Sequence, residues 1–214
     1  MIALYIKDYA VDGTEEKDIG HTVAYAMLDT LYRAKFNTPT PIIAKSELGK
    51  PYFVDCSCHF SISHGKGLCA VLLTDEGECG VDIEPEIEEN RAKKIDTRFL
   101  CDRLPVRPLK RDIELRFELT GGVNAQEPKP SGEVEIKELE LAGEVKIQGV
   151  EVENFDKMPI TAKWTVLEAV LKMSGEGFAA FSKRLEIADG ARTKTLLFAN
   201  EKRAFYVTLA VKNK

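Results

Sequence analysis

Apolar and polar positions follow two periods along the first part of the chain. Residues 2–7 form an apolar run typical of a strand, and residues 17–36 repeat apolar side chains at the spacing of an amphipathic helix. Alternation over 60–64 and 80–84, with a β-prone apolar run at 68–73 between them, predicts three further strands. This first part is therefore expected to be a helix combined with a sheet.

The later part of the chain combines the same two patterns. We expect a helix over 89–100, and alternation of apolar with charged residues over 110–153 predicts several half-exposed antiparallel strands. Another helix is expected from Thr161, an N-cap residue, to Gly175, a C′ glycine. A closing hairpin is expected after Leu185. Together these elements predict the α+β class.

The order of the predicted elements occurs twice. Strand, helix and strands are followed by strands, helix and strands, which indicates two similar α+β halves. We place the N-terminal half at residues 1–105 and the C-terminal half at 106–214. The second half would contain the β-rich segment at about 110–153 as an insertion.

Composition and charge limit the classes of function. The 214 residues are 44% hydrophobic and 30% charged, which is ordinary for a globular protein. A net charge of −5 without a basic stripe argues against a nucleic-acid partner. Apolar runs are too short for a membrane span, and the N-terminal residues have the pattern of a strand and not of a signal peptide. A cytoplasmic protein without a membrane partner is therefore expected.

The cysteines are expected to be reduced thiols. Without an export signal, an odd number of cysteines favours the cytosol, and the five are Cys56, Cys58, Cys69, Cys79 and Cys101. Cys56, Cys58 and the adjacent His59 are zinc-type ligands. A structural zinc site needs four ligands, and no second Cys/His pair is present, so buried or loop thiols are the favoured interpretation.

Two carboxylates lie on one face of the predicted strand at 80–84. Asp82 and Glu84 are separated by one residue, so both point to the same side, whereas Val81 and Ile83 point into a core. Adjacent carboxylates repel unless a cation lies between them, and their oxygens suit Mg²⁺. A strand with a solvated acidic face is the alternative. On the residues alone, the solvated acidic face is the favoured interpretation.

Other charged residues are weaker candidates. Glu168 and Lys172, one helical turn apart, are typical of a surface ion pair. Lys50 follows a glycine in a turn, where its ammonium can reach a phosphate. His64 precedes Gly-Lys-Gly, where backbone N–H groups can approach an anion, although a hydrogen-bonded structural histidine is the alternative.

Four motifs occur in an informative order. They are Gly49-Lys50-Pro51-Tyr52-Phe53, Phe60-Ser61-Ile62-Ser63-His64, Gly80-Val81-Asp82-Ile83-Glu84 and Trp164-Thr165-x-x-Glu168-Ala169-x-x-Lys172. The combination resembles the 4′-phosphopantetheinyl transferase superfamily, and the chain length is similar to that of its two-halved, Sfp-type branch. The resemblance is dense over residues 45–100 and 160–180.

The resemblance implies an enzyme. It would transfer the 4′-phosphopantetheine arm of coenzyme A to a serine of an apo acyl or peptidyl carrier protein and release 3′,5′-ADP. Asp82, Glu84 and Glu168 would hold Mg²⁺, or Mn²⁺, together with the pyrophosphate. Glu168 would also help to deprotonate the serine, and Lys172 would hold the pyrophosphate and steady the departing phosphate. The positions that would clasp the nucleotide and its phosphates are Lys45, Lys50, Ser63 and His64.

The same resemblance implies a fold and a set of partners. Two α+β halves would be related by a pseudo-twofold axis in a monomer. The carrier would belong to fatty-acid, polyketide, nonribosomal-peptide or lysine-pathway biosynthesis, and the sequence leaves the choice open. Two features depart from the family: Leu167 replaces a lysine, and Glu84 and Glu168 are far apart in sequence. They motivate a second hypothesis, a non-catalytic descendant that binds coenzyme A or a carrier protein without transfer.

Overall fold

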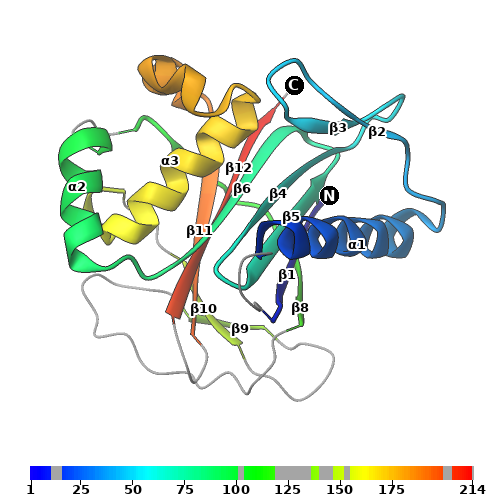
Figure 1. Ribbon diagram of the computed structural model, residues 1–214, viewed down its shortest axis with the longest axis horizontal. Coiled ribbons are helices and arrows are strands. Elements are labelled where there is room, and N and C mark those ends of the chain that lie inside the picture. Colours follow the sequence, from blue (N-terminus) through cyan, green and yellow to red (C-terminus); the bar gives the residue numbers. More distant parts are fainter. Residues whose placement is uncertain are drawn as a thin grey trace.

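Two β-sheets, each covered by helices, make up the protein, so the predicted α+β class is confirmed (Figure 1). The computed structural model describes residues 1–10, 16–100, 104–118, 136–139, 147–151, 155–199 and 204–213. Within these residues, no helix is both long enough and apolar enough to cross a membrane.

The first sheet has the strand order β4-β5-β1-β8. Its strands are β1 (Ile2–Asp8), β4 (His59–Gly65), β5 (Leu68–Thr74) and β8 (Glu114–Glu118). Helix α1 (Glu16–Phe36) lies over one face of this sheet. The short strands β2 (Ile43–Lys45) and β3 (Pro51–Phe53) form a separate hairpin.

The second sheet has the order β6-β12-β11-β10-β9, and β7 pairs with β11. Its strands are β6 (Gly77–Pro85), β7 (Arg107–Pro108), β9 (Ile136–Leu139), β10 (Ile147–Glu151), β11 (Arg192–Ala199) and β12 (Ala204–Asn213). Helix α3 (Ile160–Ser174) lies on β6 and β12 (Figure 1). The remaining helical segments are α2 (Glu89–Phe99), η2 (Phe155–Lys157), η3 (Gly177–Lys183) and α4 (Arg184–Ala188).

The hydrophobic core has an inner part and two outer parts. Alternate residues of the strands, such as Leu4, Val81 and Val207, are fully buried between the two sheets. On the opposite faces, one cluster lies under α1 and another surrounds α3. Each sheet therefore has apolar residues on both faces, and polar side chains directed at a helix, such as Asp82, can be buried.

The two sheets do not follow the expected division of the chain at residue 105. Strand β6 precedes that position but pairs with β12 in the second sheet. Strand β8 follows it but pairs with β1 in the first sheet. Each half of the sequence thus contributes one strand to the sheet built mainly by the other half.

Two details of the predicted elements were wrong. Strand β8 runs parallel to β1, whereas the alternation over 110–153 had predicted antiparallel strands. Helix α3 has Pro159 and not Thr161 as its N-cap. The Thr161 side chain instead accepts a hydrogen bond from the Ile87 backbone N–H (3.1 Å), which ties the chain after β6 to the start of α3. The end of α3 at Gly175, which has a left-handed φ of 81°, is as predicted.

Candidate active site

The site begins with an unusually close approach of α3 to β6. A Cβ atom on Gly80 would lie 1.9 Å from the Ala169 carbonyl oxygen and 2.5 Å from the Met173 nitrogen. Only glycine has room here, so α3 rests directly on the backbone of β6. As a result, the carboxylates on this face of β6 are brought against the polar residues of the helix.

Asp82, Ser63 and Lys172 form a tight polar cluster at this contact. The Lys172 ammonium donates hydrogen bonds to Asp82 Oδ1 (2.6 Å) and to Ser63 Oγ (2.8 Å). The Ser63 hydroxyl also donates to Asp82 Oδ1, at 2.9 Å. Asp82 is only 2% exposed, so its charge depends on these donors for compensation. Three of the predicted site residues are thus in mutual contact.

Glu168 completes the cluster as a second, closely placed carboxylate. Burial, followed by the charge of Asp82, raises the pKa of Glu168 from its usual value to about 8. Lys172, one turn along α3 with its ammonium 3.9 Å from a Glu168 oxygen, opposes this rise. Two facing carboxylates in a buried setting therefore retain a proton near neutral pH unless a cation takes its place.

The second oxygen of Asp82 is the clearest sign of a missing positive partner. Oδ2 is buried, and among the described residues none donates a hydrogen bond to it. Buried carboxylate oxygens are normally satisfied. Carboxylate oxygens are also the donors that Mg²⁺ and Mn²⁺ prefer. Asp82 and Glu168 therefore fit a small divalent cation in the chemistry of their donor atoms.

Glu84, the third predicted metal ligand, contacts cations of the protein instead. One of its oxygens accepts a hydrogen bond from Lys66 (3.0 Å), and the other lies 3.6 Å from Arg91 of α2. Its charge still contributes to the raised pKa of Glu168. Over the described ranges, no three acidic, histidine or cysteine side chains converge closely enough to hold a metal ion. The structure therefore brings Asp82 and Glu168 together but not Glu84.

Two serines join the edge strands of the two sheets beside this cluster. Val81 N–H donates to Ser61 Oγ at 3.0 Å, and Ile83 N–H donates to Ser63 Oγ at 3.4 Å. Side-chain hydroxyls thus take the place of backbone carbonyls where β4 meets β6. The sequence prediction included Ser63 and overlooked Ser61, although alternation along β4 places both on one side.

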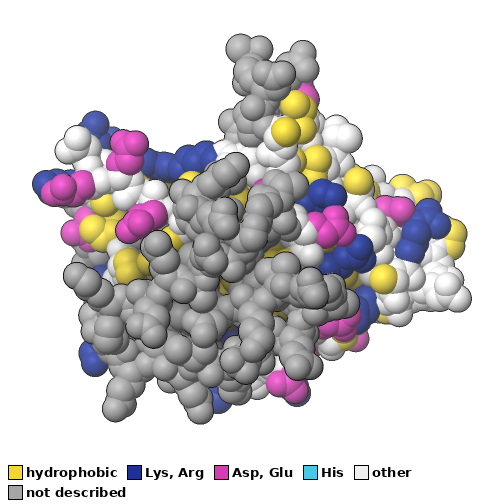
Figure 2. All heavy atoms as spheres, turned by 90° about the horizontal axis from the view of Figure 1, so that it is seen from below, with side chains coloured by type: hydrophobic (Ala, Val, Ile, Leu, Met, Phe, Trp, Pro, Cys, Tyr) yellow, Lys and Arg dark blue, Asp and Glu magenta, His cyan; other side chains and the backbone are white. Residues whose placement is uncertain are grey.

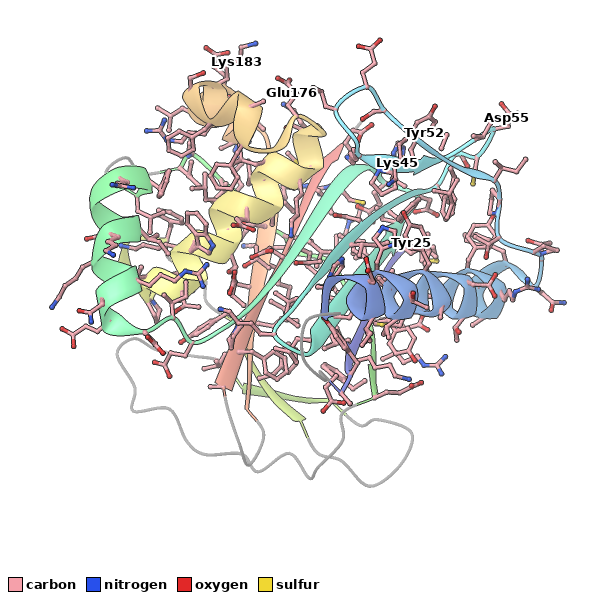
Figure 3. The ribbon with its side chains drawn as sticks, in the orientation of Figure 1. Tyr25, Lys45, Tyr52, Asp55, Glu176 and Lys183 are labelled. Atoms are coloured by element: carbon pink, nitrogen blue, oxygen red, sulfur yellow. The ribbon has the colours of Figure 1, made fainter. Side chains whose placement is uncertain are left out.

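The other predicted nucleotide-binding residues lie in different places. His64 points away from Ser63 toward α1: a Cβ on Gly20 would lie 2.6 Å from its ring, and His21 makes an edge contact with it. Lys45 is an exposed residue of β2. Figure 3 shows Lys45 and Tyr52 on the β2–β3 hairpin, opposite Glu176 at the end of α3. The structure thus places His64 against α1 and Lys45 on the exposed hairpin.

Two adjoining cavities open between that hairpin, β4 and the end of α3. The smaller, of about 200 Å³, has Lys50 and Lys172 in its wall together with Ser61. The larger, of about 500 Å³, shares Lys50 and Phe60 with it, and its wall also includes Tyr52 and the acidic Glu78. Two lysines thus line the smaller cavity, and one of them, Lys172, also contacts the buried Asp82.

Leu167 departs from the family motif without entering the site. Its side chain is fully buried in the core cluster around α3, with Trp164 and Leu171. The residue at the position of the resembling family's lysine therefore packs in the core.

The described cysteines are free thiols, as predicted. Cys56 is half-buried, and Cys58, Cys69 and Cys79 are buried. Cys101 lies outside the described residues.

The described surface carries both signs of charge side by side. Figure 2 shows Lys/Arg and Asp/Glu side chains interspersed on the face seen from below.

Compared with models of known protein families and with curated proteins, the chain matches none of them. What the site can do must therefore be judged from its own residues and charges.

Proposed function

We propose that the protein transfers the 4′-phosphopantetheine arm of coenzyme A to a serine of an apo acyl or peptidyl carrier protein. The observation that carries the proposal is the buried Asp82–Glu168 pair with Lys172 beside it. Lys172 also lines a cavity together with Lys50. Such a site suits a substrate that combines phosphate groups with a transferable phosphoryl centre.

The reaction replaces the phosphoanhydride bond of coenzyme A by a phosphate ester bond to the carrier. The carrier serine oxygen forms a bond to the phosphorus next to pantetheine, and the bond from that phosphorus to the bridging pyrophosphate oxygen breaks. The leaving group is 3′,5′-ADP, which carries the electron pair of the broken bond as negative charge. Stabilisation of that charge is the main requirement for catalysis.

The residues of the cluster divide this work between them. In the ionised state, Glu168 accepts the serine proton, while Asp82 remains bonded to Lys172 and Ser63. Lys172 lines the smaller cavity, where its ammonium would neutralise oxygens of the pyrophosphate. A divalent ion held by Asp82 and Glu168 would supply further positive charge to those oxygens.

The arrangement of the halves supports the same proposal. A helix lies over each sheet, and the site lies where the two sheets adjoin, an arrangement compatible with two α+β halves. We include in the proposal a monomer with pseudo-twofold symmetry, in the cytoplasm, acting on carriers of fatty-acid, polyketide or nonribosomal-peptide synthesis.

A transfer assay tests the proposal directly. Purified protein is incubated with coenzyme A, Mg²⁺ and a panel of apo carriers, and mass spectrometry measures the carriers. We expect a mass gain of one phosphopantetheine group, abolished by a chelator and restored by added Mg²⁺ or Mn²⁺. Asp82→Asn and Glu168→Gln should each reduce the rate by at least about 100-fold, because each removes a charge from the reacting centre.

A matched surface variant serves as the control for that assay. Glu114→Gln also removes one carboxylate, but Glu114 is on β8 and pairs with Lys35 of α1, away from the cluster. It should transfer at the wild-type rate. Wild-type rates in both Asp82→Asn and Glu168→Gln would contradict the proposed site.

A second candidate is binding of coenzyme A without transfer. The pairing of Glu84 with Lys66 and Arg91, which keeps a third carboxylate out of the cluster, favours it. Calorimetric binding of coenzyme A together with no mass gain on any carrier would support this candidate over transfer. Glu84→Gln distinguishes the two further, because it should slow transfer only if Glu84 joins the cluster in the complex.

A further inference from the structure

Lys50 has a role in the structure that differs from the one expected of a phosphate ligand. Its ammonium donates to the Met173 carbonyl oxygen at 2.8 Å and to Glu78 Oε2 at 2.9 Å. Met173 is in the last turn of α3, directly after Lys172. Lysine side chains commonly satisfy the terminal carbonyls of helices in this way.

The stem of Lys50 is fitted to the end of the helix as well. Gly175 ends α3 in the left-handed conformation, and a Cβ there would lie 3.1 Å from the Lys50 Cδ. The absence of a side chain at Gly175 thus makes room for the lysine. The Lys50 side chain is accordingly only 18% exposed, little for a lysine.

The turn that carries Lys50 is itself closed by hydrogen bonds. Lys50 N–H donates to the Ser46 hydroxyl (3.0 Å), and Ser46 N–H donates to the Lys50 carbonyl (2.9 Å). Glu78, at the start of β6, holds the ammonium from the other side. The Lys50 backbone is therefore held by Ser46, and its ammonium is held by Glu78 and by the end of α3.

We propose that Lys50 is a positioning residue that anchors the last turn of α3 and so holds the Lys172 ammonium over Asp82. This inference rests on the proposed function, because Lys172 is the group whose position matters for transfer. In this proposal Lys50 does not contact the phosphate directly but acts on the site through α3. Glu78 supports the anchor by keeping the Lys50 ammonium in place.

Amide hydrogen exchange tests the anchor without reference to activity. In Lys50→Met, the bond to the Met173 carbonyl is lost, so amides of the last turn of α3 should exchange about tenfold faster than in the wild type. Glu78→Gln keeps Lys50 and should show a smaller acceleration in the same turn. Exchange in α1 should not change in either variant.

The chain offers a closely matched control. Lys35 is also 18% exposed and pairs with an exposed glutamate, Glu114, just as Lys50 pairs with Glu78. Lys35→Met should leave exchange at the end of α3 unchanged. Unchanged exchange there in Lys50→Met as well would overturn the proposal, provided that the variant keeps the wild-type circular dichroism.

Steady-state kinetics of transfer separates positioning from direct binding. A displaced Lys172 should lower kcat roughly tenfold in Lys50→Met while KM for coenzyme A stays within about twofold. A tenfold rise of KM with unchanged kcat and unchanged exchange would identify Lys50 as a phosphate ligand instead. If the wild type transfers nothing, the proposed function fails, and hydrogen exchange alone still decides whether Lys50 anchors α3.

Discussion

Helices α1 and α3 both lie on a sheet, but their contacts with it differ in chemistry. Helix α1 packs on the first sheet through apolar side chains such as Met27, Leu28 and Leu31. Helix α3 also has an apolar side, yet it meets β6 backbone to backbone at Gly80 and places Glu168 and Lys172 against Asp82. The comparison shows that, of two helices that each cover a sheet, the one that approaches a strand backbone closely buries charged side chains against it.

The largest expected effect comes from opening the close contact of α3. Gly80→Ala places a methyl group where backbone atoms lie 1.9 and 2.5 Å away, so helix and strand must separate. We expect a loss of about 3 kcal/mol in the free energy of unfolding, measured by urea denaturation.

Helix α1 provides the counterpart of that substitution. In Gly20→Ala, the new methyl group would meet the Tyr9 hydroxyl and the His64 ring, which are side chains and can turn aside. Alanine also favours a helix by about 1 kcal/mol, so the net loss should stay below about 1 kcal/mol. Equal losses at Gly80 and Gly20 would contradict the difference between the two helix contacts.

An intermediate effect is expected when the buried ion pair of α3 is broken. Lys172→Met leaves the nearly inaccessible Asp82 carboxylate without its cation, which should cost about 2–3 kcal/mol. Lys35→Met, which breaks a pair between α1 and β8 whose glutamate is exposed, should cost less than about 1 kcal/mol. Chemical denaturation measures the free energy of unfolding of both variants.

Addition of Asp82→Asn to Lys172→Met should recover part of the loss in stability. A double variant whose loss equals the sum of the two single losses would argue against the pairing.

The smallest expected effect is the change of stability over a single pH unit. Because the pKa of Glu168 is raised to about 8, the folded protein keeps a proton that the unfolded chain releases above pH 4.5. Stability should therefore decrease as pH rises from about 4.5 to 8, by at most about 1.4 kcal/mol per pH unit.

Glu168→Gln should remove this contribution. The difference in unfolding free energy between the variant and the wild type is measured at pH 6 and at pH 7, because contributions that both proteins share, such as those of the histidines, cancel in this difference. A chelator is present in both measurements. A difference that is the same at both pH values would show that Glu168 is not held protonated by its surroundings.

Local pattern was sufficient to predict most elements of this fold. Helices α1, α2 and α3 and the terminal hairpin β11–β12 follow the predicted periodicities within a few residues, and the C′ glycine of α3 was identified. The parallel pairing of β8 with β1 could not be read from alternation, because alternation reports which face is buried but not which strand lies alongside.

The site was predicted less completely than the fold, for a related reason. That Asp82 and Glu84 share a face is a local property of a strand. The meeting of Asp82 with Lys172 depends instead on the distance between a helix and a strand that are far apart in sequence. Gly80 is the residue that sets this distance. A glycine within an alternating strand is a known sign of close backbone approach, and this sign was overlooked.

The exchange of β6 and β8 between the sheets has a consequence for how the protein assembles. Neither sequence half contains all the strands of a sheet, so a fragment ending near residue 105 would leave β6 without β12 and β1 without β8. The two sheets thus depend on each other for completion, and Asp82 and Lys172 are expected to meet only when both parts are complete. Coupling between folding and site formation would keep partly folded chains, including those still being synthesised, from presenting a working site.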